Sequence, residues 1–300
     1  MTDAPNASFG FTPRIYPRPS YPHLIELCWS FVKGCFLEGA LLSTVVSFAL
    51  FPVYRSSIDQ IRNIYPNSSE QLIFTILLSL SHIFIWTVVN IPLYICDTHG
   101  YYQEYKLHRS KGQIPNTALV NHTFITAAVS QLITSPLMGF YIYPVFVHFG
   151  MLPLDTKFPS LMELLHTYAI GYIFNDTFFY FTHRLLHMKA LYFLHKQHHS
   201  YAGTMGISAE YAHPMEVLLS NIFPTIGGVV FFGCHHPYCV IVWIFMRLEQ
   251  TYMAHSGYAF KNTWLDMVGL AHSDSAIFHD HHHTTNRGNF GGNMLWDYVL

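Results

Sequence analysis

The long apolar runs of this chain constrain its fold more than any other feature. A helix needs roughly 20 apolar residues to cross a bilayer. Four stretches reach that length, namely Phe31 to Tyr54, Leu72 to Ile95, Leu119 to Met151 and Met162 to Phe181. Because a chain in lipid must satisfy its own backbone hydrogen bonds, we predict an all-α integral membrane protein with about four transmembrane helices.

Composition agrees with a membrane protein and argues against a nucleic-acid partner. Hydrophobic residues make up 51% of the chain and charged residues 11%, compared with about 25% charged in a typical soluble domain. The net charge of -2 gives no basic surface for a polyanion. The 5 cysteines contain no CxxC pair, so we expect free thiols and not a disulfide framework.

Two apolar segments contain helix-breaking residues. Leu119 to Met151 includes Pro136 and Pro144, which fits either one kinked span or a re-entrant piece. The segment 215–248 is interrupted by Pro224 and neighbouring glycines. For this second segment we predict a shallow apolar hairpin at the membrane interface, which leaves and rejoins the same face.

The placement of basic residues gives a topology. Three groups of basic residues lie before the first span, between the second and third spans, and after the fourth span. With four spans these groups share one face of the membrane, which the positive-inside tendency makes cytoplasmic. These groups are Arg14 and Arg18; Lys106, Arg109 and Lys111; and Arg184, Lys189 and Lys196. We therefore predict a cytoplasmic segment (1–30), transmembrane helices (31–181) and a cytoplasmic histidine-rich catalytic domain (182–300). Residues 1–22 are polar and proline-rich, so insertion is expected to use internal spans.

Three histidine clusters indicate a metal centre. They read HRLLH, HKQHH and HDHHH, and positions three or four apart share one face of a helix. Together they offer more nitrogen donors than one tetrahedral ion accepts, so we predict two metal ions. In the last cluster the H-x2-HH pattern selects His279, His282 and His283, so we expect His281 to face away from the metal. The predicted ligands are His183, His187, His195, His198, His199, His279, His282 and His283.

Rival metal sites fit these motifs less well. A zinc protease requires H-E-x-x-H, and a carboxylate di-iron bundle requires E-x-x-H pairs, whereas HRLLH and its companions lack those glutamates. Iron is preferred because zinc has no redox chemistry for activating dioxygen. A membrane metal carrier or sensor is the alternative from a different class. The position of the clusters beside the apolar runs, not within them, favours an enzyme.

Four further residues are predicted to orient the ligand rings by binding their second nitrogen. They are Asp176, Glu210, His213 and Glu216, which are polar groups within or next to apolar sequence. For the glutamates an ion pair or a helix cap is an equally good interpretation, and His213 precedes Pro214, which suits a structural role. Residues 288–292 are interpreted as a turn, and His235, His236 and His272 as caps or solvent-facing groups.

The motif order resembles that of the membrane fatty acid hydroxylase and sterol desaturase superfamily. HRLLH, HKQHH, AEYAHPME, AHSGY and FHDHHHTTNRGNFG occur in that order from about Asp176 to the end of the chain. AEYAHPME, RLEQTYMAHSGY and FHDHHH are most similar to 4-methyl sterol oxidases. The chain departs from that group at His281, where an aromatic residue is common, and at YAGTMGIS after HHS. These departures bear on the substrate.

The resemblance implies a mostly helical non-haem di-iron oxygenase of the endoplasmic reticulum membrane. It adds His255, in its HSGY context, as the ninth ligand of two iron ions (Fe2+/Fe3+). The implied reaction uses dioxygen and electrons from a cytochrome b5-type donor with an NAD(P)H reductase. The expected substrate is a sterol-like lipid, oxidised at an unactivated C–H of its 4-methyl group. Another sterol or fatty-acyl hydroxylase or desaturase of the same superfamily is the alternative.

Overall fold

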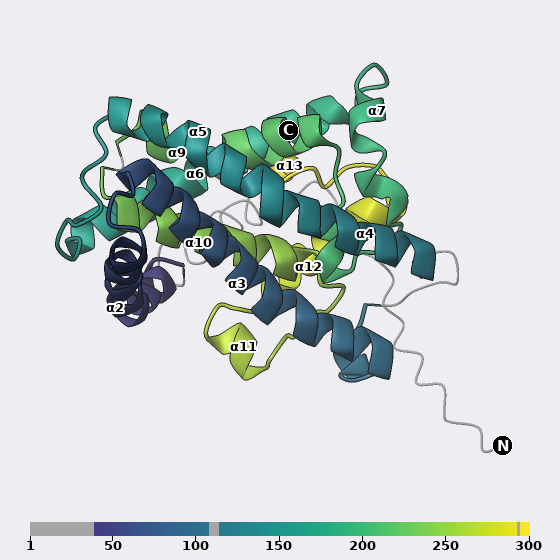
Figure 1. The fold of residues 1–300 in the computed structure, drawn as a ribbon. Coiled ribbons are helices and arrows are strands. Elements are labelled where there is room, and N and C mark those ends of the chain that lie inside the picture. Colours follow the sequence, from purple (N-terminus) through teal and green to yellow (C-terminus); the bar gives the residue numbers. More distant parts are fainter. Residues whose placement is uncertain (1–38, 108–113, 234, 293–294) are drawn as a thin grey trace.

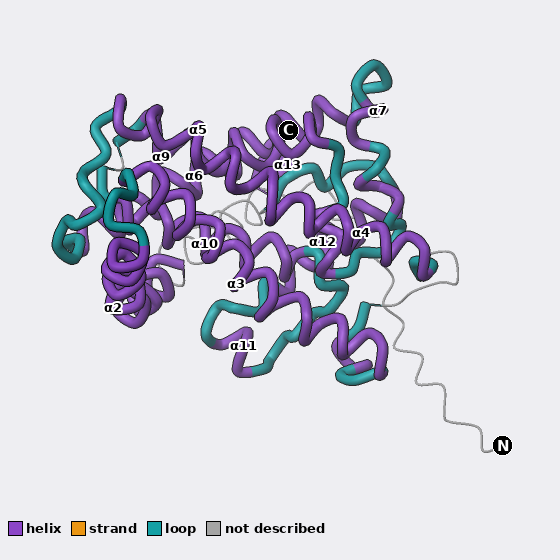
Figure 2. The backbone as a smooth tube through the Cα atoms, in the orientation of Figure 1, coloured by secondary structure: helices purple, strands orange, loops and turns teal. Residues whose placement is uncertain are grey.

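The fold was analysed in a computed structural model, which describes residues 39–107, 114–233, 235–292 and 295–300 (Figure 1). Within those ranges the regular elements are helices, as Figure 2 shows, and the β-structure is limited to an isolated bridge between Lys106 and Tyr258. The prediction of an all-α protein is therefore confirmed. The predicted segment 1–30 and the beginning of the first predicted span lie outside the described residues.

Four helical segments are long and apolar enough to cross a membrane, which confirms the expected number. They are Leu41–Ile64, within α2 (Ala40–Ile64), Glu70–His99 (α3), Thr117–His148 and Pro214–Phe231. The identity of the fourth differs from the prediction. Met162 to Phe181 falls in α6 (Leu161–Leu186), which is long enough but does not meet the apolar criterion. The reason is that α6 carries Glu163, Asn175 and Asp176 among its apolar residues.

The third apolar run forms one continuous helix with a wide turn near its middle. It consists of α4 (Thr117–Val129), a π-helical turn η4 (Ser130–Thr134) and α5 (Ser135–His148). Pro136 has no N–H with which to bond back to the preceding turn, so the helix widens just before it. Of the two alternatives for this segment, the structure has the kinked helix.

The segment after the second histidine cluster is a pair of helices joined by a turn. Its first arm contains α8 (Pro214–Glu216), the π-helical turn η7 (Val217–Ile222) and α9 (Phe223–Phe231). Its second arm is α10 (Pro237–Ala254). The first arm begins at Pro214 and carries Glu216 beside the histidines, and the second arm ends next to His255. The predicted hairpin is thus helical and returns to its starting point, whereas its position in the membrane interface stays a prediction.

Short helices carry the histidine motifs between the long ones. α6 ends with the first motif, and α7 (Tyr192–His195) and η5 (His198–Ser200) carry the second. The third lies on α12 (Ser273–Thr285). The remaining short elements are η2 (Gln103–Tyr105), η6 (Gly206–Glu210), α11 (Trp264–Met267) and α13 (Leu295–Val299).

Glycines allow α6 to pack closely against its neighbours α9 and α10. A Cβ placed on Gly171 of α6 would lie 2.5 Å from Cε2 of Trp243 on α10. A Cβ on Gly228 of α9 would lie 2.5 Å from Cβ of Phe174 and 3.0 Å from the Ile170 carbonyl oxygen. Small residues at such contacts let helix backbones approach one another in membrane proteins. This packing fixes the direction in which the end of α6 points its histidines.

Replacing Gly171 by leucine should destabilise the helix bundle. The new side chain would overlap the Trp243 ring, and overpacking of this kind costs about 1–3 kcal/mol. Thermal unfolding in detergent, followed by the loss of monodisperse protein, should therefore shift to lower temperature. Gly139→Ala is the matched control, because its Cβ would meet Leu78 at 3.3 Å, a contact that a small side-chain shift relieves. An unchanged midpoint for Gly171→Leu would contradict this account of the packing.

Candidate metal centre

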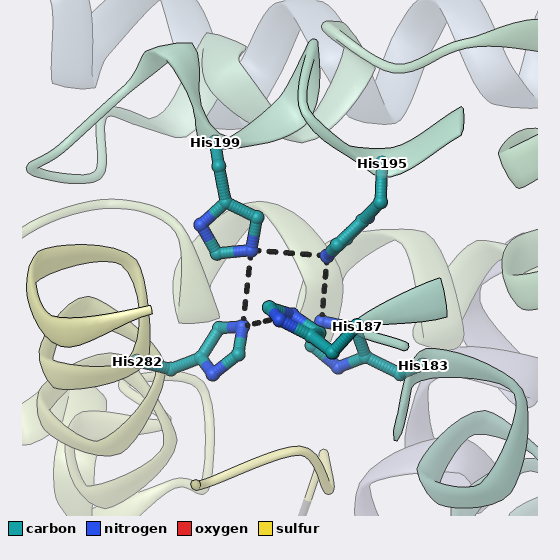
Figure 3. Close-up of side chains that lie close together, drawn as sticks. All are labelled: His183, His187, His195, His199 and His282. Carbon is teal, nitrogen blue, oxygen red and sulfur yellow. Dashed lines mark hydrogen bonds between the residues drawn. The ribbon is translucent and has the colours of Figure 1, made fainter. Parts of the chain in front are cut away.

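Five histidines from four short stretches point their rings at a common centre (Figure 3). His183 lies in the last turn of α6, and His187 follows directly at its C-terminal cap. His195 ends α7, His199 belongs to η5, and His282 lies on α12. Each offers one ring nitrogen, and these nitrogens all lie within 4.8 Å of one another. We call this set the first histidine group.

The spacing of the nitrogens in the first group suits a metal ion. His195 Nε2 lies 3.1 Å from His183 Nε2 and 3.0 Å from His199 Nε2. His282 Nε2 lies 3.1 Å from His199 Nε2 and 3.1 Å from His187 Nε2. Donors about 2.1 Å from an ion are about 3.0 Å apart at right angles and about 3.4 Å apart in a tetrahedron. The observed spacing therefore favours an ion with more than four ligand positions.

A second histidine group adjoins the first and contains His198, His255, His279 and His283, all of them buried. Their Nε2 atoms form a closed ring. The Nε2–Nε2 distances are 3.3 Å between His198 and His255, 2.8 Å between His255 and His279, 3.1 Å between His279 and His283, and 3.1 Å between His283 and His198. The separations are close to those of the first group.

The two groups share neighbouring residues of the chain. His198 belongs to the second group and His199 to the first, and His282 belongs to the first and His283 to the second. The rings of His199 and His283 stack with their centroids 4.6 Å apart. His281 lies on the same helix, is only partly buried and belongs to neither group. The structure thus brings together all nine histidines singled out in the sequence, and their role as metal ligands stays a prediction.

Backbone carbonyls set the orientation of several rings. A carbonyl oxygen can only accept, so a ring nitrogen that contacts it must carry the proton, which leaves the other nitrogen as a lone pair. Four rings are held in this way through Nδ1. The pairs are His183 with Phe290 at 2.7 Å, His282 with Gly288 at 2.6 Å, His255 with Thr251 at 2.8 Å and His283 with Tyr201 at 2.8 Å. Their Nε2 lone pairs therefore face the group centres.

Burial keeps these imidazoles neutral. It lowers the pKa of His187 to about 4, of His198 to about 3 and of His255 to about 4. The pKa values of the other six rings are lowered further, first by burial and then by the neighbouring imidazoles. Neutral imidazole is the form that binds metal ions, so the site is ready to bind a cation at neutral pH.

Glu216 is placed where the sequence analysis expects a residue that orients a ligand ring. Its Oε1 lies 2.9 Å from Nδ1 of His195, and both side chains are buried. Burial raises the pKa of Glu216 well above its usual value, and its effect on the donor strength of His195 stays a prediction. Asp176 is buried on α6, where its carboxylate lies beside Gly292. That places it next to the turn that holds His183, and its effect on the ligands stays a prediction.

Two other expected orienting residues have different partners. Glu210 accepts from the Tyr252 hydroxyl at 2.6 Å and lies 2.8 Å from Nε2 of His82, which connects η6 to α10 and α3. Although burial alone would raise the pKa of Glu210, His82 and Tyr252 lower it below its usual value. His213 accepts from the Met215 N–H at 3.2 Å and caps α8. The structure therefore assigns both residues to helix connections outside the histidine groups.

Some contacts at the site have no signal in the sequence motifs. The turn at residues 288–292, interpreted from sequence as structural, supplies the Gly288 and Phe290 carbonyls described above. Asp280, inside the third motif, accepts from the N–H and the hydroxyl of Thr204, each at 2.8 Å. His272 does not simply face solvent, because its Nε2 lies 2.9 Å from Glu249 Oε2.

These features define a class, a helical membrane protein with two adjoining groups of buried imidazoles. Residues 168–300 match the model of the fatty acid hydroxylase family. Methylsterol monooxygenase erg25B of Aspergillus fumigatus is 33% identical over 70% of this chain and 71% of the relative. C-4 methylsterol oxidase of Candida albicans is 30% identical over 75% of this chain and 73% of the relative. Methylsterol monooxygenase 1 of Gallus gallus is 30% identical over 72% of this chain and 72% of the relative. No solved structure matches.

The chain therefore belongs to the fatty acid hydroxylase family. The resemblance inferred from the order of the histidine motifs is confirmed. The expectation of an oxygenase-type oxidoreductase is confirmed at the level of that class by the relatives named monooxygenases.

Removing one ligand of the second group should lower the metal content selectively. We expect His255→Ala to reduce the bound metal from about two ions per chain to about one, because the first group keeps all five rings. Elemental analysis of the purified protein measures this directly. His281→Ala is the matched control, a histidine of α12 outside both groups, and should retain the full content. Equal losses in the two variants would contradict the assignment of ligands.

The metal-free protein should lose stability on acidification. The folded pKa values of the histidines lie below the unfolded value of about 6.5, so the unfolded chain binds more protons. The stability that these rings contribute is fully present above that pH, and it decreases as the pH falls through about 6.5 toward the folded values. Thermal unfolding of chelator-treated protein at pH 7.5 and 5.5 tests the sign. A midpoint that does not fall at the lower pH would show that the rings are not buried as neutral groups.

Proposed function

We propose that this protein is a membrane-bound non-haem di-iron monooxygenase that oxidises the C-4 methyl group of a sterol. The observation that carries the proposal is the pair of adjoining imidazole groups, one of five rings and one of four. The names of the relatives, which are methylsterol monooxygenases and C-4 methylsterol oxidases, support the choice of substrate.

The donor set supports iron over zinc. Structural zinc is almost always bound by four ligands in a tetrahedron, whereas the first group alone presents five nitrogens at separations near 3.0 Å. Imidazole ligands suit iron, and spare positions on the ion are needed for reactants. When bound, two irons would supply the reduction of dioxygen that oxidation of an unactivated C–H bond requires. The nine histidines would hold both ions.

Two neighbouring cavities support a lipid substrate. One cavity faces the histidines and is lined by His183, His195, His198, His255 and His279. The other is mostly apolar and lies among helices α3, α5, α9 and α10, with Leu78, Phe146, Ile226 and Leu248 in its wall. Both cavities include Ala209, Asn221, Arg247 and Thr251. A flat apolar molecule in the second cavity would thus lie next to the cavity that faces the histidines.

The balance of the reaction requires a redox partner. One oxygen atom of dioxygen enters the C–H bond to give an alcohol, and the other leaves as water, which consumes electrons and protons from outside the substrate. Because imidazole ligands supply no electrons, we propose that a cytochrome b5-type protein with its NAD(P)H reductase delivers them. The corresponding location is the endoplasmic reticulum membrane, with the histidine-rich domain on the cytoplasmic side.

The purified iron-loaded protein should convert a 4-methyl sterol when it is supplied with dioxygen and an electron donor. We expect one atom of labelled dioxygen in the product by mass spectrometry. His198→Ala and His282→Ala should each lower turnover at least about 100-fold, because each removes a ligand, while His281→Ala should not. Preferential oxidation of an acyl lipid would select the related acyl hydroxylases or desaturases. Bound metal without lipid-dependent oxygen consumption would favour a metal carrier.

A further inference from the structure

Arg247 lies at the junction of the two cavities. It belongs to α10 and lines both the cavity that faces the histidines and the apolar one. Its Nε donates to Asn175 Oδ1 at 2.6 Å, and its Nη1 donates to Thr251 Oγ1 at 2.5 Å. The carbonyl of Thr251 in turn accepts from Nδ1 of His255. Thr251 therefore links the Arg247 guanidinium to His255 of the second histidine group.

The hydrogen bonds of the Arg247 guanidinium go to an amide and a hydroxyl, and Asp176 lies close enough to interact electrostatically with its charge. A buried cation in apolar surroundings is costly and marks a functional position in membrane proteins. Burial lowers the pKa of Arg247 to about 10, which still leaves it positively charged at neutral pH. Nη2 makes no hydrogen bond within the described part of the chain. Its donors are thus available for an oxygen atom in the cavity.

We propose that Arg247 binds the hydroxyl group of the sterol substrate and so positions the neighbouring C-4 methyl group toward the metal centre. The inference rests on the proposed function. In a sterol the hydroxyl is carried by the ring carbon next to C-4, so both groups must enter the metal-facing cavity together. Arg247 supplies charged donors at the entrance of that cavity, and the apolar cavity behind it receives the rings.

A purely structural role is the rival explanation, since Arg247 also connects α10 to Asn175 on α6. The two roles differ in what they do to substrate choice. A structural tie would weaken the binding of every lipid equally when it is removed. A hydroxyl-binding role would weaken only lipids that carry the hydroxyl, because a site built for a polar group discriminates against ligands that lack it.

The test measures equilibrium binding of two radiolabelled lipids to the iron-loaded protein without an electron donor. The lipids are a 4-methyl sterol and its analogue with hydrogen in place of the hydroxyl. We expect the wild type to bind the sterol about tenfold or more tightly than the analogue, as for a hydrogen bond to a charged group. Arg247→Gln should remove that preference and leave the affinity for the analogue within about twofold. Arg247→Lys should keep part of the preference, because it retains the charge without the planar fork.

The controls separate the inference from folding and from the proposed function. Arg55→Gln removes a partly exposed arginine that pairs with Asp155 and should leave both affinities unchanged. Metal content and the thermal midpoint are measured for each variant. Equal weakening of both lipids by Arg247→Gln, or a wild type that does not distinguish them, would overturn the role of Arg247. A wild type that shows the preference but oxidises neither lipid when given electrons would support the role and refute the proposed function.

Discussion

Repulsion between unshielded imidazole nitrogens is the constraint on which the rest of this structure depends. Within each group, neighbouring ring nitrogens lie 2.8–3.3 Å apart, and two lone pairs at that distance repel unless a proton or a cation lies between them. Burial disfavours the charged imidazolium form at neutral pH, and a ring whose Nδ1 donates to a carbonyl has no proton on Nε2 in its neutral form. The surrounding helices must therefore hold the rings together until a cation is bound.

The packing of the long helices supplies that rigidity. Glycines at 171 and 228 let α6, α9 and α10 approach closely, so that the ends of α6 and α10 deliver His183 and His255 to the same place. Glu216 lies at the beginning of a helix that is apolar enough to span a bilayer, and it contacts His195. Packing of the long helices and orientation of the rings are thus parts of one arrangement.

The sequence predicts those aspects of the site that depend on local spacing. Histidines four residues apart, such as His279 and His283 on α12, share a face of the helix and fall in the same group, as helix geometry predicts. His282, three residues after His279, belongs to the other group. Partners far apart in sequence have no such pattern, as with Glu210 and His82, which are 128 residues apart. Contacts to backbone carbonyls, such as that of Phe290 with His183, cannot be predicted from residue types because every residue has a carbonyl. Length alone favours a span at Met162 to Phe181, whereas α6 also carries the buried polar groups Asn175 and Asp176, and the helix Pro214–Phe231 is apolar enough to cross a membrane instead.

The two consecutive histidine pairs have a further mechanical meaning. In each pair, at positions 198–199 and 282–283, one member belongs to each histidine group, so one peptide unit joins the two groups at each of these two places. Because peptide units are stiff, a shift of the backbone under one group would move the backbone under the other. Binding of a cation by one group would therefore influence how the other group is held.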